Sequence, residues 1–178
     1  VRAPVPARPG RPALRDSEYK RRGTANIFAI VAPRLGVHLT HATRNRKSPS
    51  YVRALQRIAA KFPKAKRIHL VQDNLSSHTE AACIRTLGPE KGRKLWGRFI
   101  VHFTPKHGSW LTMAEIEFSV LSRQCLGRRL PDQATLAQEV AAWEAERNAM
   151  AATVHWRFTT ADARIKLKHL YPVVEPIN

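Results

Sequence analysis

The sequence predicts an α/β protein with a mixed sheet flanked by helices. Short apolar runs rich in β-branched residues alternate along the chain with longer segments whose apolar residues recur at helical spacing. Strands and helices that interleave in this way build a sheet covered by helices. The chain has 178 residues, enough for one domain with a substantial core.

The first ordered elements form a predicted hairpin. Residues 27–31 are a continuous apolar run, which is typical of a strand buried on both faces. Pro33 ends the run and Gly36 lies in the turn. Residues 37–43 then alternate as expected for the return strand.

A helix and a third strand follow the hairpin. Pro49 predicts a helix start at Ser48 or Ser50, and Pro63 stops that helix. The segment 67–72 is a short apolar strand, and it delivers Asp73 at its carboxyl end.

The second half continues the alternation. We expect the helix of residues 133–149 to be capped by Asp132. The helix before it should turn Leu111, Ile116, Val120 and Leu121 inward. The expected elements in order are a helix at 78–87, a break at 88–94, a strand at 98–105, a loop and helix at 106–127, the helix at 133–149 and a last helix at 160–171.

The charge indicates a polyanion as partner. Lys and Arg number 31 against 13 acidic residues, a formal net charge of +18. Such a surplus is typical of nucleic-acid binding, with a solvated basic surface or contact with anionic lipid as the alternatives. No apolar run approaches the ~20 residues that cross a bilayer, and the start of the chain is no secretory signal. We therefore expect a cytoplasmic protein.

The cysteines and the two ends of the chain each allow a direct prediction. Cys83 and Cys125 lie among apolar residues of expected helices and predict buried free thiols, and no zinc-ligand spacing is present. Residues 1–23, rich in Pro and Arg, predict an extended basic arm. Residues 24–170 form the expected domain and residues 171–178 a tail.

Two carboxylates are the strongest candidates for a site. Asp73 follows a strand, where functional groups of open α/β sheets collect. Glu115 begins the helix after the next strand and is preferred over Glu117. Two positions on a helix point about 200° apart, so only one of these acids faces the sheet, and the positions of Leu111 and Phe118 favour Glu115.

Paired acids at one site indicate a divalent cation. Carboxylate oxygens select Mg²⁺ or Mn²⁺ over zinc, and two such ions promote cleavage of a phosphodiester. The structural alternative is an Asx turn at Asp73 and Asn74, with Glu115 as a first-turn acid favoured by the helix dipole.

Four segments resemble the DDE transposases of bacterial insertion sequences in the mariner superfamily. They are "YKRRGTANIFAIV", "HLVQDNLSSHT", "VHFTPKHGSWLTMAEIEFSVLSRQCLGRRL" and "VHWRFTTADARIKL", together spanning roughly residues 17 to 165. The resemblance implies a ribonuclease-H-like fold over residues 24–170 and metal-dependent DNA cleavage and transfer. Asp73 then corresponds to the second catalytic acid and Glu115 to the third, with two Mg²⁺ or Mn²⁺ ions in the complete protein.

The resemblance also implies partners and a location. DNA, as transposon ends and target, is the expected partner, a homodimer forms in the DNA complex, and the protein is bacterial and nucleoid-associated when bound. Two departures from the family pattern matter.

The first is Thr112, which replaces the usual Asn three residues before the glutamate and so weakens any role of this position in orienting Glu115.

The second departure concerns the first catalytic Asp. In the family it lies on a strand upstream of the basic arm, and Asp16 is no ready substitute, so we expect a sheet without its first strand and a chain that alone does not cleave DNA. We likewise expect this chain to lack the helix-turn-helix that the family carries upstream. The alternative function is an inactive transposase remnant that binds nucleic acid. A basic ribonucleoprotein component would leave the two acids unexplained.

Other polar residues flank the two acids. His78 either contacts a phosphate or orders the loop, or is only a polar residue at a helix start. Lys106 and His107 suit phosphates, and Trp110 either stacks on a base or packs in the core, which we favour. Arg123, Arg128 and Arg129 form a DNA track or compensate the helix dipole.

Overall fold

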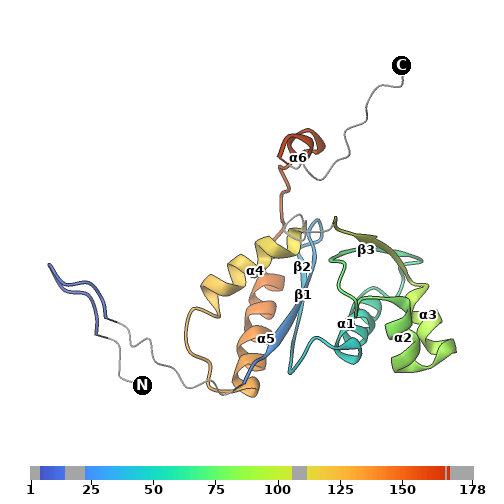
Figure 1. The fold of residues 1–178 in the computed structure, drawn as a ribbon, viewed down its shortest axis with the longest axis horizontal. Helices are drawn as coiled ribbons and strands as arrows, with labels where there is room; N and C mark the ends of the chain where they lie inside the picture. Colours follow the sequence, from blue (N-terminus) through green and yellow to red (C-terminus); the bar gives the residue numbers. More distant parts are fainter. Residues whose placement is uncertain (1–4, 15–22, 106–111, 167, 169–178) are drawn as a thin grey trace.

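The computed structural model describes residues 5–14, 23–105, 112–166 and 168. Its elements interleave as predicted, in an α/β arrangement (Figure 1). In order, they are β1 (Asn26–Ala32), β2 (Val37–Thr43), α1 (Ser48–Lys61), β3 (Ile68–Gln72), α2 (Glu80–Leu87), α3 (Pro89–Trp96), β4 (Phe99–Phe103), α4 (Met113–Gln124), α5 (Gln133–Ala149) and α6 (Thr160–Lys166).

The strands form two pairs. β1 and β2 are the predicted antiparallel hairpin, in which Ile30 lies opposite Leu39, and β3 pairs with β4 in parallel, in which Leu70 lies opposite Val101. The expectation of a single mixed sheet is therefore wrong for the described residues, because no ladder joins the two pairs there.

Helices cover the β1–β2 hairpin on both faces (Figure 1). Leu39 of β2 belongs to a core with α1, α2 and Phe99 of β4. Ala42 of the same strand and Ile27 of β1 pack against a second core between α4 and α5. Since side chains alternate across a strand, the two cores lie on opposite faces of the hairpin.

β1 was predicted as a strand buried on both faces; it packs against a core on each face, but its residues are only half-buried along its whole length. Among the described residues β1 has a ladder partner along one edge only, which leaves its backbone partly accessible. β2 differs, because α5 side chains bond its backbone on the side away from β1. Asn148 pairs with both the N–H and the carbonyl of His38, and a Glu144 carboxylate accepts from the Thr40 N–H.

The third strand is only half covered. Ile68 and Leu70 of β3 pack on the α1 core, whereas Val71 is 59% exposed and Phe103 of β4 is 46% exposed. Helices α1, α2 and α3 therefore cover one face of this strand pair, and Val71 points away from them.

The predicted helices form where expected, and one further helix, α3, was not predicted. α1 begins at Ser48 as predicted, and α5 carries the predicted cap, in which the Thr135 N–H donates to Asp132 at 2.7 Å. Residues 88–94, predicted as a break, mostly belong to α3. A Cβ on Gly92 would lie 2.7 Å from the backbone of Ile84, so the glycine lets α3 lie tightly on α2.

Both cysteines are buried free thiols, as predicted. No helix in the described segments is both long enough and apolar enough to cross a membrane. Residues 5–14 form a narrow hairpin, with Val5 bridged to Leu14, where we expected an extended arm. Gly10 supplies the positive φ of its turn. The tail 171–178 lies outside the described residues.

The chain after α5 returns to the β1–β2 turn. Val154 N–H donates to the carbonyl of Pro33 at 3.1 Å. Gly36, at φ +59°, lies so close to Ala151 that a Cβ on Gly36 would come within 2.4 Å of the Ala151 backbone. Only glycine fits this contact.

Candidate active site

Asp73 lies where the sequence predicts it, directly after β3. Gln72, the last residue of the strand, is buried, while the Asp73 side chain is 45% exposed. The N–H of Thr104 donates to the Gln72 carbonyl at 2.9 Å, so the carboxyl ends of β3 and β4 lie side by side. The carboxylate thus stands at a strand end with solvent access.

His78 is the partner of Asp73. Its Nδ1 lies 2.8 Å from Asp73 Oδ1, although the ring N–H does not point along a hydrogen-bond direction, and the imidazole is 12% exposed. The ring stacks on Tyr51 of α1, with centroids 4.2 Å apart. Burial lowers the pKa of His78, and Asp73 opposes that shift. His78 thus lies between Asp73 and α1, and the roles predicted for it stay predictions.

The loop from 73 to 79 is tied back to the strand and to α1. Gln72 Nε2 donates to the His78 carbonyl at 3.0 Å, and the Tyr51 hydroxyl donates to Gln72 Oε1 at 2.8 Å. Burial raises the pKa of the Tyr51 hydroxyl, which keeps it a donor over the physiological range. Thr79 closes the loop by capping α2 at the Ala82 N–H. Asn74 is exposed.

Glu115 and Glu117 are placed opposite to our helix-face argument. Both lie near the start of α4, but Glu115 is exposed and Glu117 is 3% exposed. Ile116, predicted to face inward, is 41% exposed. Leu121 is fully buried as predicted, so the inward face of α4 is the one that Glu117 shares with Leu121, four residues on.

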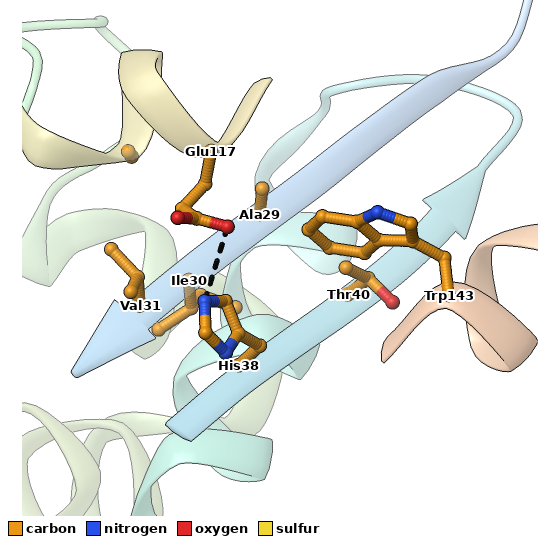
Figure 2. Close-up of a pocket in the computed structure, with 8 residues that line it drawn as sticks. Ala29, Ile30, Val31, His38, Thr40, Glu117 and Trp143 are labelled. Carbon is orange, nitrogen blue, oxygen red and sulfur yellow. Dashed lines mark ion pairs between the residues drawn. The ribbon is translucent and has the colours of Figure 1, made fainter. Parts of the chain in front are cut away.

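Glu117 is buried because it has two basic neighbours. Figure 2 shows it pointing from α4 toward His38 of β2, beside Trp143. Its Oε2 lies 3.1 Å from His38 Nε2. Arg147 of α5 donates through the single nitrogen Nη2 to both carboxylate oxygens, at 2.8 and 2.9 Å, in a charge-assisted contact.

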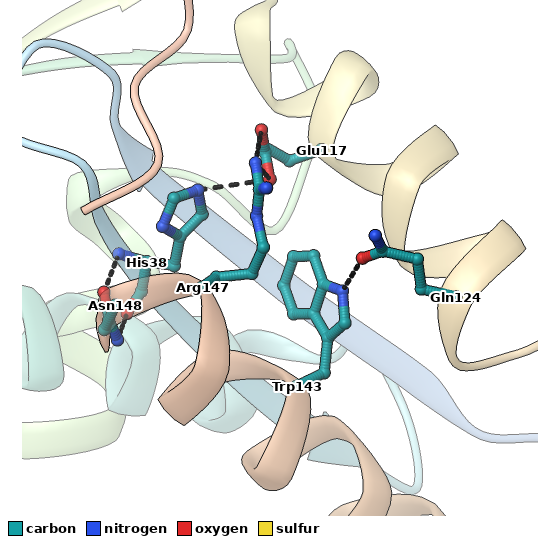
Figure 3. Close-up of polar contacts among 6 residues, drawn as sticks. All are labelled: His38, Glu117, Gln124, Trp143, Arg147 and Asn148. Carbon is teal, nitrogen blue, oxygen red and sulfur yellow. Dashed lines mark hydrogen bonds and ion pairs between the residues drawn. The ribbon is translucent and has the colours of Figure 1, made fainter. Parts of the chain in front are cut away.

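The groups around this pair are also fixed (Figure 3). The Trp143 indole donates to Gln124 Oε1 of α4 at 2.8 Å, and its ring meets His38 edge-on. Arg147 lies 5.8 Å from the centroid of the Trp143 ring. These contacts lock α4 onto β2 and α5, which turns Glu115 outward at the edge of the helix.

The carboxylates of Asp73 and Glu115 suit a hard cation, but they are only two possible ligands. Asp73 and Glu115 offer carboxylate oxygens, the ligands that Mg²⁺ and Mn²⁺ prefer. The contact with His78 is made through Asp73 Oδ1, and the Asp73 side chain is 45% exposed. Within the described residues no group of three or more His, Cys, Asp or Glu gathers as a metal site. The Thr112 carbonyl accepts from the Glu115 N–H, and its side chain makes no cap bond.

The predicted DNA contacts divide into two sets. Arg123 donates to Ser119, Arg128 forms an ion pair with Glu139 at 2.5 Å, and Arg129 is exposed. Arg128 is thus partly neutralised, which fits a structural role better than a phosphate contact. The second set, Lys106, His107 and Trp110, lies outside the described residues.

Sequence reasoning missed the residues that hold the Asp73 loop and the Glu117 carboxylate in place. The sequence predicted the helix α1, but nothing local indicated the bond of its Tyr51 to Gln72. Arg147 gave no signal as the partner of Glu117. An arginine on the buried side of an amphipathic helix is the pattern that would have raised the question.

Comparison with known proteins identifies the family. The sequence matches the DDE superfamily endonuclease family over residues 1–137, which is more than half of the chain. No curated protein and no solved structure matches it. The match contains the β1–β2 hairpin, the Asp73 strand end and the Glu115 helix. The chain belongs to the DDE superfamily endonucleases.

Proposed function

We propose that the chain is the catalytic part of a DDE transposase with a ribonuclease-H-like fold, in which Asp73 and Glu115 serve metal-dependent cleavage and joining of DNA strands. The observation that carries the proposal is Asp73, half-exposed at the end of β3 and held by His78, in a chain of the DDE superfamily. The surplus of 31 basic over 13 acidic residues suits a DNA substrate.

Each residue has a distinct role in this proposal. Asp73 and Glu115 hold Mg²⁺ or Mn²⁺ through carboxylate oxygens, and the ions supply activation of the attacking oxygen and stabilisation of the leaving oxygen. His78 positions the Asp73 carboxylate and, through its stacking on Tyr51, fixes it relative to α1. Glu117 orients α4 and with it Glu115.

The first catalytic acid of the family is part of the proposal as well, besides Asp73 as the second and Glu115 as the third. Two-metal chemistry needs enough carboxylates to hold both ions, and Asp73 and Glu115 supply two. By the family resemblance the other acid lies on a separate strand. We therefore expect residues 1–178 alone to bind DNA without cutting it, and a full-length protein that carries this acid as well to cut.

A nicking assay tests the proposal. Supercoiled DNA is incubated with the full-length protein and Mg²⁺ or Mn²⁺, and the relaxed product is quantified. We expect metal-dependent nicking that Asp73→Ala or Glu115→Ala lowers by at least about 100-fold, because each change removes a ligand of the ions.

Two controls sharpen the assay. Glu80→Ala removes an exposed acid in the first turn of α2, which has no role in the proposed metal site, and should leave nicking unchanged. Nicking that survives Asp73→Ala would defeat the site assignment. DNA binding without any nicking by the full-length protein would favour the inactive remnant.

A further inference from the structure

A basic loop lies between β2 and α1. It consists of residues 44–47, Arg44, Asn45, Arg46 and Lys47, and all four are exposed. In the part of the chain that the structure describes, none of its three cations forms an ion pair with an acid. By contrast, Arg57, Arg128 and Arg147 each pair with a glutamate.

The backbone of the basic loop is fixed by its own polar groups. Asn45 accepts from the Lys47 N–H through Oδ1 at 3.0 Å, and its carbonyl accepts from the Thr43 hydroxyl at 2.8 Å. Asn26 of β1 donates to the Arg44 carbonyl at 3.4 Å. The loop is therefore preorganised, while the Arg46 and Lys47 side chains extend from it into solvent.

The basic loop borders the Asp73 loop. Ser77 donates its hydroxyl to the Arg46 carbonyl at 3.3 Å. Ser77 directly precedes His78 in this loop. His78 in turn lies 2.8 Å from Asp73. A polyanion that reaches Asp73 therefore meets the basic loop.

We propose that the basic loop binds the phosphodiester backbone of the DNA strand that enters the Asp73 site. Arg and Lys contact phosphate oxygens without reading the bases, which fixes the strand in place. α1 begins directly behind the loop with no acidic residue in its first turn, so its dipole adds to the positive field. The proposal rests on the proposed function.

The test compares two double substitutions of equal charge in the full-length protein. Arg46→Ala/Lys47→Ala removes two of the three exposed cations of the basic loop. The control, Arg93→Ala/Lys94→Ala, removes two exposed cations of α3. α3 leads into the start of β4, and because β3 and β4 are parallel, it lies at the end of that strand pair opposite to Asp73.

DNA affinity is measured by fluorescence anisotropy with a mixed-sequence duplex, in EDTA, over a series of salt concentrations. We expect Arg46→Ala/Lys47→Ala to weaken binding by about 10- to 100-fold at ~0.1 M salt and to reduce the slope of log K against log salt by about 2, as for two lost phosphate contacts. The control pair should change affinity by less than about 3-fold.

Two further measurements make every outcome decisive. Arg46→Lys/Lys47→Arg keeps the charge and should retain binding, and thermal melting checks that all variants fold. Equal binding and equal salt slopes for the two alanine pairs would overturn the proposal. Weakened binding in a protein that never nicks DNA would uphold the basic loop and defeat only the proposed function.

Discussion

At the scale of single residues, the buried Glu117 has the largest expected effect on stability. Its carboxylate is 3% exposed and is satisfied by Arg147 and His38. A charge left without its partner in such a place is strongly unfavourable. Removing Glu117 would therefore leave the Arg147 charge without a partner, and removing Arg147 would do the same to Glu117.

Glu117→Gln should lower the free energy of unfolding by about 3 kcal/mol, because it leaves the Arg147 guanidinium buried without a counter-charge. Urea unfolding measures the change. Glu115→Gln, two residues away on the same helix, is the matched control and should stay within about 0.5 kcal/mol of wild type, since Glu115 is exposed. Equal losses in the two variants would contradict the assigned orientation of α4.

His41 of β2 makes stability depend on pH. Burial, with added effects of Arg57 and Arg53, lowers its pKa below 6.5. The folded state then binds fewer protons than the unfolded state just below that pH, so stability falls as the pH drops through 6.5 toward the folded pKa.

We expect His41→Gln to lose less stability than wild type between pH 7.5 and pH 5.5, measured by urea unfolding at both values. His78, whose pKa is also lowered, contributes in the same direction and is unchanged in the comparison. His155→Gln, an exposed control, should follow the wild type. A His41→Gln variant as acid-sensitive as wild type would exclude this role.

At the scale of elements, local patterns were sufficient where local chemistry decides the structure. The proline at the start of α1, the Asp132 cap of α5 and the alternation of β2 all predicted their elements. α3 was missed because its Pro and Gly were interpreted as breakers. Pro89 in fact starts the helix, and Gly92 permits close contact with α2.

Side-chain direction was harder to predict than element type. The choice between Glu115 and Glu117 depends on Arg147 and His38, which are remote in sequence, so helical spacing alone could not show which acid is buried. The position of Asp73 at a strand end was predictable because it depends only on where β3 stops.

The end of α5 offers a stabilising substitution. Ala151 has φ +45° and follows the helix in a Schellman arrangement, in which the Ala152 N–H donates to the Arg147 carbonyl and the Ala151 N–H to the Asn148 carbonyl. Glycine is preferred at this position because a Cβ is strained there.

Ala151→Gly should raise the free energy of unfolding by about 0.5–1 kcal/mol, measured by thermal melting. Ala149→Gly, the same change in the last residue of the helix, should lower it by about 0.5–1 kcal/mol, since a helical glycine only adds freedom to the unfolded chain. The same sign for both variants would show that the turn after α5 adds no strain.

At the scale of the whole molecule, the strand pairs differ in how their backbone is protected. β2 has β1 on one side and the side chains of Asn148 and Glu144 on the other. In the described residues β3 has a ladder partner only in β4, and Val71, a residue of β3 itself, is exposed. Edge amides of this kind open more easily than amides enclosed on both sides.

This difference predicts slow amide hydrogen exchange in the half of the protein that contains β2 and fast exchange in the half that contains β3 and β4. Peptides covering residues 37–43 should retain hydrogen longer than peptides covering residues 68–72 and 99–103, as mass spectrometry after timed labelling would show. Indistinguishable rates would mean that the two halves open together. Asp73 lies in the fast half, so divalent metal or DNA, by favouring the closed form of β3 and β4, should slow exchange there first.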